Sequence, residues 1–114
     1  MQFSSARQIK LSDACKTVPT KDGKASALQF EHGSLQVKIY SPKGTDPQTP
    51  HSRDELYVVA FGTGWFVNEG QRLQFAPGDA LFAAAGEVHR FENFSDDFAV
   101  WVMFYGPEGG EHGQ

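Results

Sequence analysis

The feature that most constrains the fold of this chain is a rhythm of short apolar segments broken by turn residues. Eight such segments follow residue 25, at about ten residues for one strand and one turn, and no helix-length periodic segment lies between them. Parallel strands need long crossover connections, so this spacing favours an antiparallel sandwich or barrel. The sequence therefore predicts an all-β domain with strands at 27–31, 35–40, 55–61, 64–68, 72–75, 80–84, 88–94 and 98–105.

The chain is expected to form one domain, because its 114 residues are enough for a single core. Residues 1–24 are polar, with a weak helical pattern from Ile9 to Ala14 that ends before Pro19 and Gly23. This part is predicted to be an N-terminal arm or short helix on the outside of the domain. The β domain is assigned to residues 25–105, and residues 106–114 form a C-terminal tail that is expected to be loose at its end.

Composition and charge argue against several classes of partner. Acidic residues outnumber basic ones by 14 to 10 and no Lys/Arg cluster occurs, so nucleic acid is not an expected partner. The longest apolar run, residues 98–104, is far shorter than the roughly 20 residues of a membrane helix, so no membrane interaction is expected.

The single cysteine, Cys15, cannot form an intramolecular disulfide and is read as an inert thiol. With no signal-peptide pattern, we expect a cytoplasmic protein.

Two predicted strand segments, 56–61 and 98–104, are apolar on both alternating faces. Such strands are typically covered from both sides. The cover can be a second sheet or another copy of the chain, and a homodimer is therefore expected.

Two histidines and one glutamate form the main candidate site. His51 precedes Glu55 by four positions at the start of an apolar strand, and strand alternation places His89 on the same face as Phe91, toward the interior. Two imidazoles and a carboxylate can hold a divalent transition metal. On spacing alone, a histidine packed and hydrogen-bonded in the core is the simpler interpretation. The remaining histidines, His32 and His112, are expected to be exposed.

The segment GDALFAAAGEVHRFEN, from Gly78 to Asn93, resembles the second conserved motif of the cupin superfamily. That motif has a Gly, five residues, Pro-x-Gly, two residues, a His, three residues and an Asn. Gly78, Gly86, His89 and Asn93 fall in register, and Ala84 stands where the motif usually has Pro.

The upstream segment HSRDE is similar to the first cupin motif, in which His-x-His is followed by three or four residues, a Glu, six residues and a Gly. This similarity makes His51 the second histidine, Glu55 the carboxylate and Gly62 the turn residue. Thr49 stands in the place of the first histidine. The resemblance covers residues 25–105.

The resemblance implies an antiparallel double-stranded β-helix, the cupin or jelly-roll barrel. It also implies a divalent transition metal (Fe, Mn, Ni, Zn or Cu) held by His51, Glu55 and His89, with water or substrate in place of the poor ligand Thr49. The implied function is a metal-dependent enzyme, a dioxygenase or an isomerase or lyase, that acts on a small organic molecule. The alternative is a non-catalytic cupin that binds a small ligand and whose metal is weak, structural or absent.

Three further residues are catalytic candidates. Arg53 could bind a substrate carboxylate, although a surface pair with Asp54 or Glu31 explains it equally well. Tyr57 or Tyr105 could donate a hydrogen bond to a metal-bound intermediate. Asn93 is expected to be a structural hydrogen-bonding residue. Four large apolar residues could line a pocket for a partly apolar ligand, although packing in the core is the simpler interpretation. They are Trp65, Phe91, Trp101 and Met103.

Overall fold

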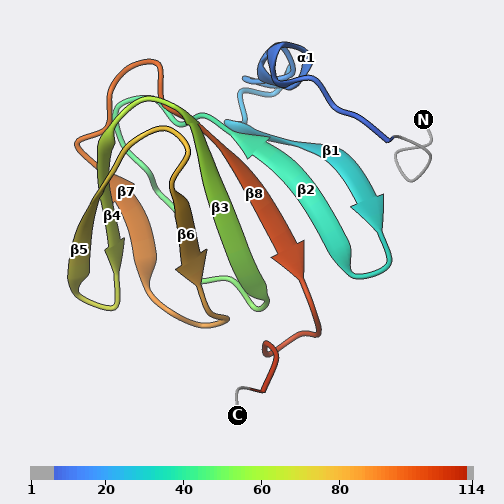
Figure 1. The fold of residues 1–114 in the computed structure, drawn as a ribbon, viewed down its shortest axis with the longest axis vertical. Coiled ribbons are helices and arrows are strands. Elements are labelled where there is room, and N and C mark those ends of the chain that lie inside the picture. The colour runs from blue at the N-terminus through green and yellow to red at the C-terminus, as the bar shows by residue number, and fades with distance from the viewer. Residues whose placement is uncertain (1–6, 113–114) are drawn as a thin grey trace.

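The computed structural model describes residues 7–112, which form two antiparallel sheets preceded by a short helix (Figure 1). The all-β fold predicted from the sequence is confirmed, and each predicted strand lies within two residues of an observed one. The elements of this part of the chain are α1 (Leu11–Cys15), β1 (Ser26–His32), β2 (Leu35–Tyr40), β3 (Asp54–Phe61), β4 (Gly64–Asn68), β5 (Gln71–Phe75), β6 (Ala80–Ala83), β7 (His89–Glu92) and β8 (Ala99–Tyr105).

The sheets differ in size and bring together strands that are distant in the chain. Five strands pair in the order β1-β2-β8-β3-β6, and three pair in the order β5-β4-β7. All pairings are antiparallel. Because β3 and β7 belong to different sheets, residues on their inner faces meet across the interior (Figure 1).

The core between the sheets consists largely of aromatic rings. Phe91 packs against Phe98 at 4.8 Å and against Tyr57 at 5.0 Å between ring centroids. Phe66 is the cross-strand partner of Phe91 and is buried with it. Large rings bury much apolar surface per residue, which suits a domain of this length.

The connection between β3 and β4 passes from one sheet to the other and depends on two glycines. Gly62 has a φ of 93°, and a Cβ there would lie 2.7 Å from the Cα of Phe98. Gly64 has no positive φ, but its Cβ would lie 2.8 Å from the Cα of Phe94. The predicted turn at Gly62 is thus confirmed and is left-handed, whereas Gly64 is required by close backbone packing.

The N-terminal arm contains α1, close to the expected helix, with Ala14 fully buried. Figure 1 places α1 near the start of β1 and the end of β2. At the other terminus, the backbone N–H of Gly109 donates to the carbonyl of Ser52 at 2.6 Å, which holds the tail against the domain. The expected loose end falls on residues 113–114, outside the described residues. Within the described part, no helix is long and apolar enough to cross a membrane.

The outer face of the five-stranded sheet carries exposed apolar side chains. Leu56 on β3 and Phe82 on β6 are cross-strand partners and are 37% and 49% exposed. Their neighbours Glu55 and Tyr57 point inward and are buried. The outer face of β3 is therefore exposed at Leu56 within this chain, and the expected homodimer stays a prediction.

Candidate metal centre

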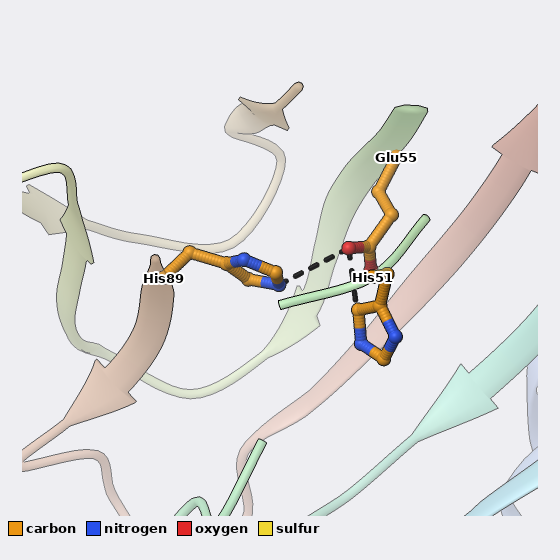
Figure 2. A group of neighbouring side chains, drawn as sticks. All are labelled: His51, Glu55 and His89. Atoms are coloured by element: carbon orange, nitrogen blue, oxygen red, sulfur yellow. Dashed lines mark ion pairs between the residues drawn. The ribbon is translucent and has the colours of Figure 1, made fainter. Parts of the chain in front are cut away.

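Three side chains from separate parts of the chain meet between the sheets. Glu55 lies on β3, His89 on β7 and His51 in the segment before β3, and one donor atom of each lies within 4.8 Å of the others (Figure 2). The ring centroids of His51 and His89 are 5.4 Å apart. The structure thus brings together the three residues that the sequence predicted as ligands.

His89 presents one nitrogen to this centre and anchors the other. Its Nδ1 lies 2.9 Å from the carbonyl oxygen of Glu87, which accepts a hydrogen bond and leaves Nε2 to face the centre. Nε2 is buried and lies 3.1 Å from Oε2 of Glu55, yet it has no hydrogen-bond partner among the described residues. A nitrogen lone pair opposite a carboxylate oxygen requires a proton or a cation between them.

The pKa of His89 reflects this arrangement. Burial favours the neutral imidazole, but the contact with Glu55 and the hydrogen bond to the Glu87 carbonyl outweigh it and raise the pKa above the usual 6.5. When no other cation is bound, a proton on His89 is therefore held more tightly than on a free histidine. A metal ion at this nitrogen would displace that proton.

Glu55 is an almost fully buried carboxylate with one anchored oxygen. The hydroxyl of Tyr57 donates to Oε1 at 2.8 Å, while Oε2 faces the histidines and lies 3.8 Å from Nε2 of His51. Burial and then the negative charge of Glu55 raise the pKa of Tyr57 well above 10, so the hydroxyl stays protonated and remains a donor. Tyr57, a catalytic candidate from the sequence, therefore lies at the centre.

His51 is partly exposed and is positioned by its neighbours. Its ring packs edge-on against Phe104 at 5.3 Å between centroids. Its backbone carbonyl accepts a hydrogen bond from Gly86 at 2.8 Å. The segment that carries His51 is therefore tied directly to the turn that precedes His89.

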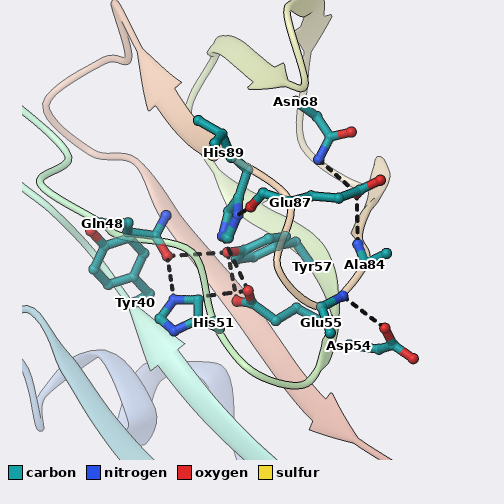
Figure 3. Close-up of polar contacts among 12 residues, drawn as sticks. Tyr40, Gln48, His51, Asp54, Glu55, Tyr57, Asn68, Ala84, Glu87 and His89 are labelled. Atoms are coloured by element: carbon teal, nitrogen blue, oxygen red, sulfur yellow. Dashed lines mark hydrogen bonds and ion pairs between the residues drawn. The ribbon is translucent and has the colours of Figure 1, made fainter. Parts of the chain in front are cut away.

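Gln48 also reaches this centre and was not among the residues predicted from the sequence. Its Oε1 lies 3.2 Å from both Nε2 of His51 and the hydroxyl of Tyr57 (Figure 3). Thr49, which occupies the place of the missing motif histidine, is exposed instead. The only sequence signal for Gln48 is an amide one residue before Thr49, and no motif assigns a function to that position.

A pocket of about 170 Å³ opens beside the centre. Lys38 lies on its wall, with Nζ 5.4 Å from the ring centroid of Phe104, and the cross-strand partner of Lys38 is the buried Val102. Among the described residues, no ion pair involves Lys38. The lining residues are Ser26, Lys38, Tyr40, Gln48, His51, Glu55, Val102 and Phe104. A larger cavity of about 800 Å³ near α1 contains none of the three predicted ligands.

The other two catalytic candidates lie outside this cluster. Arg53 donates to the carbonyls of Ser34 and Gly106, which links the β1–β2 turn to the C-terminal segment. Tyr105 is the cross-strand partner of Asp54 and lies on the opposite face of β8 from Phe104. The carboxylate-binding role of Arg53 and the hydrogen bond from Tyr105 to a metal-bound intermediate stay predictions.

The four side chains considered for a pocket do not line the one beside the centre. Phe91 belongs to the core, and Trp65 stacks on Arg72, whose guanidinium carbon is 4.0 Å from the ring centroid. Trp101 and Met103 alternate along β8 with buried valines, so the pleat turns them to the outer face. None of the four therefore lines the pocket beside the centre, and of the four only Phe91 belongs to the core cluster.

The remaining expectations concern isolated residues. His32 and His112 are exposed, as expected. Burial raises the pKa of the Cys15 thiol against the opposing charge of Lys43, which fits an unreactive cysteine. Asn93 is exposed with a φ of 50°, because β7 ends at Glu92 and the strand alternation stops there.

Two packed antiparallel sheets around an inward-facing His/Glu/His cluster define a class of small β proteins with a candidate metal site in the interior. The cupin domain family matches residues 36–105, more than half of the chain. The chain therefore belongs to the cupin domain family.

Three known proteins illustrate the relationship. A protein of Streptomyces coelicolor described as uncharacterized is 38% identical over 84 residues, which cover 71% of this chain and 80% of that protein. A queuine tRNA-ribosyltransferase of Herpetosiphon aurantiacus is 35% identical over 77 residues, which are 66% of this chain but 19% of that enzyme. A solved Cupin 2 conserved barrel domain protein of Salinispora arenicola has a TM-score of 0.67 and 17% identity, with 89% of this chain and 90% of that chain covered. At this identity the structural likeness concerns the fold alone.

Proposed function

We propose that this chain is a metal-binding small cupin that acts on a small organic molecule. His51, Glu55 and His89 would hold a divalent transition metal, namely Fe, Mn, Ni, Zn or Cu. The observation that carries the proposal is the convergence of three donors: the buried Nε2 of His89 lies 3.1 Å from Oε2 of Glu55, and one donor atom each of His51, Glu55 and His89 lies within 4.8 Å of the others. A single cation at this point could be held by all three side chains.

A bound metal would supply Lewis-acid polarisation of a substrate oxygen, or dioxygen chemistry if the metal is iron. The protein supplies the rest of the site. Tyr57 keeps its proton and fixes one oxygen of Glu55, and the Glu87 carbonyl fixes the ring of His89. These contacts hold the donors in place before any ligand arrives.

The pocket favours a small carboxylate as the ligand. Its volume of about 170 Å³ suits a molecule of a few heavy atoms, and Val102 and Phe104 provide an apolar wall. Lys38 contributes an ammonium group that pairs with no carboxylate of the described chain. A ligand carboxylate could bind Lys38 through a charge-assisted hydrogen bond while its apolar part packs on Phe104.

A second candidate function is a non-catalytic cupin that binds a small ligand with a weak, structural or absent metal. The observation that favours it is Thr49, an exposed residue where the cupin motif has a histidine. Three protein donors bind a metal less tightly than four of the same kind, so the metal could be dispensable for ligand binding.

Elemental analysis of protein purified without an affinity tag or chelator would separate the two candidates. We expect about one Fe, Mn, Ni, Zn or Cu per chain, as one cluster of three donors implies. Oxygen uptake and product formation would then be followed with a panel of thiols, diketones, phenolics and short carboxylates. Stoichiometric metal with substrate-dependent turnover supports the enzyme. Metal-free protein that binds a small molecule, with a melting temperature unaffected by added metal, supports the binding protein.

A further inference from the structure

We propose that the side-chain oxygen of Gln48 is a fourth protein ligand of the metal. This inference rests on the metal site proposed above and extends it. It also assigns a residue to the coordination position that Thr49 leaves without a histidine.

Asp46 determines which end of the Gln48 amide faces the centre. Nε2 of Gln48 donates to Oδ2 of Asp46 at 2.7 Å. The Asp46 carboxylate is itself buried and accepts hydrogen bonds from the backbone N–H of Phe91, at 2.8 Å, and from the hydroxyl of Tyr40. Because a carboxylate only accepts, the amide NH₂ must point to Asp46. The amide oxygen therefore points toward His51 (Figure 3).

Two of the three measured pairs of donor atoms have the separations expected for neighbouring positions in one coordination shell, whereas the third pair, Nε2 of His51 and Oε2 of Glu55, is wider at 3.8 Å. With metal–ligand bonds of about 2.1 Å, neighbouring donors lie roughly 3.0 to 3.5 Å apart in octahedral or tetrahedral geometry. Nε2 of His89 and Oε2 of Glu55 are 3.1 Å apart, and Nε2 of His51 and Oε1 of Gln48 are 3.2 Å apart. Both pairs fit the edge of such a polyhedron.

The hydrogen bonds of Gln48 do not provide a full alternative to metal binding. When Nε2 of His51 binds a metal it carries no proton, so it cannot donate to Gln48. The hydroxyl oxygen of Tyr57 lies 2.8 Å from Oε1 of Glu55 but 3.2 Å from Oε1 of Gln48, and its single proton favours the charged and closer acceptor. The amide oxygen would then lack a strong donor in a half-buried position, and a metal ion would satisfy it.

An amide oxygen is a harder donor than an imidazole nitrogen. Carbonyl and carboxylate oxygens suit Mn, whereas imidazole suits Zn and Cu. Two histidines with Glu55 and Gln48 make a set of two nitrogen and two oxygen donors. Loss of the Gln48 oxygen should therefore weaken binding of Mn(II) more than binding of Zn(II).

The test replaces Gln48 by Met, which keeps the length of the side chain and removes the oxygen, and by Ala. Thr49→Ala is the matched control, because Thr49 adjoins Gln48 and is exposed. Dissociation constants for Mn(II) and Zn(II) would be measured by competition with a chelator dye, and the visible absorption of the Co(II) form reports the coordination geometry. We expect Gln48→Met and Gln48→Ala to weaken Mn(II) binding about tenfold or more and to change the Co(II) spectrum. Thr49→Ala should change neither.

The outcomes separate this inference from the proposed metal site. If wild-type protein binds metal and both Gln48 variants keep its affinity and Co(II) spectrum, the inference is wrong and the metal site stands. Weaker binding with an unchanged Co(II) spectrum would also overturn the inference, because Gln48 would then only position His51. A wild-type chain that takes up none of these metals would overturn both proposals.

Discussion

The backbone N–H of Gly86 donates to the carbonyl oxygen of His51 at 2.8 Å. This bond joins the two segments that carry the candidate ligands, although they are far apart in sequence. Gly86 has a φ of 81° in the turn before His89. In the same turn, the side chain of Glu87 accepts hydrogen bonds from Ala84 at 2.8 Å and Asn68 at 3.1 Å. Backbone and side-chain hydrogen bonds outside the candidate ligands thus hold together the two segments that carry His51 and His89.

Replacing His89 should remove metal binding far more than replacing His32. His89→Ala deletes a buried nitrogen at the centre, whereas His32 is exposed at the end of β1. We expect the Zn(II) dissociation constant of His89→Ala to rise by about a hundredfold, as measured by chelator competition, and that of His32→Ala to stay unchanged. His89→Gln provides a second variant if the alanine substitution disturbs folding. Equal losses for His89 and His32 variants would contradict the assignment of His89 as a ligand.

Lys38→Met should reduce the preference of the pocket for carboxylates. The thioether keeps the packing of the side chain on Phe104 but removes the ammonium group. We expect the metal-loaded wild type to bind butanoate about tenfold more tightly than Lys38→Met does, with little change for butanamide, because only the carboxylate gains a charge-assisted bond. Ligand titrations followed by NMR would give both constants. The control is Lys21→Met, at an exposed position, and butanoate affinity unchanged in Lys38→Met would exclude a role for Lys38.

Asp54 should stabilise the fold above its pKa and lose this effect in acid. Its carboxylate accepts hydrogen bonds from the backbone N–H groups of Glu111 at 2.8 Å and Ala85 at 2.9 Å, and these lower its pKa below the usual 3.8. The ionised form is therefore favoured in the folded state. The stabilisation is full above the unfolded pKa and is lost as the pH falls through the folded one.

Asp54→Ala should accordingly lower the free energy of unfolding by about 2 kcal/mol near neutral pH. The difference from wild type should shrink once the pH falls below about 4. Urea denaturation at a series of pH values checks this. Asp96→Ala is the control, at an exposed aspartate. A difference that stays constant down to strongly acidic pH would show that Asp54 does not act through its charge.

The exposed pair Leu56 and Phe82 should form the centre of a homodimer interface. Both side chains lie on the outer face of the five-stranded sheet, where they are cross-strand partners. Burying adjacent apolar side chains against a second copy would stabilise a symmetric dimer. We expect sedimentation velocity to give a dimer for wild type and a monomer for Phe82→Asp. Leu73→Asp, at a site 40% exposed on the other sheet, should remain dimeric. A monomeric wild type would contradict the homodimer.

Strand positions could be predicted because their signals are local. Alternation of apolar residues and the placement of glycines predicted the eight strands. The same alternation predicted that His89 points to the interior, where it is buried. The strand order and the assignment of strands to two sheets do not follow from such signals. The resemblance to cupin motifs, rather than periodicity, brought His51, Glu55 and His89 into one predicted site.

Gln48 and Lys38 show what local patterns leave open. Gln48 lies in a loop, and its orientation depends on Asp46, which is held by Phe91, a residue 45 positions away in the chain. Lys38 lies beside the centre because β2 pairs with β8 and thereby faces Phe104. Trp101 was considered as a pocket residue, but it does not line this pocket because the pleat of β8 turns its side chain to the outer face.

By itself, the sequence determined where the strands lie, which residues turn the chain, and which histidines and glutamate match a known motif. Only the tertiary structure decided which side chains complete the centre, what anchors them and where the pocket opens. The physical reason is that strand and turn formation depend on residues adjacent in the sequence. The surroundings of Gln48 and Lys38 consist of contacts between residues distant in the sequence, and these contacts form only when the strands pair and the two sheets pack.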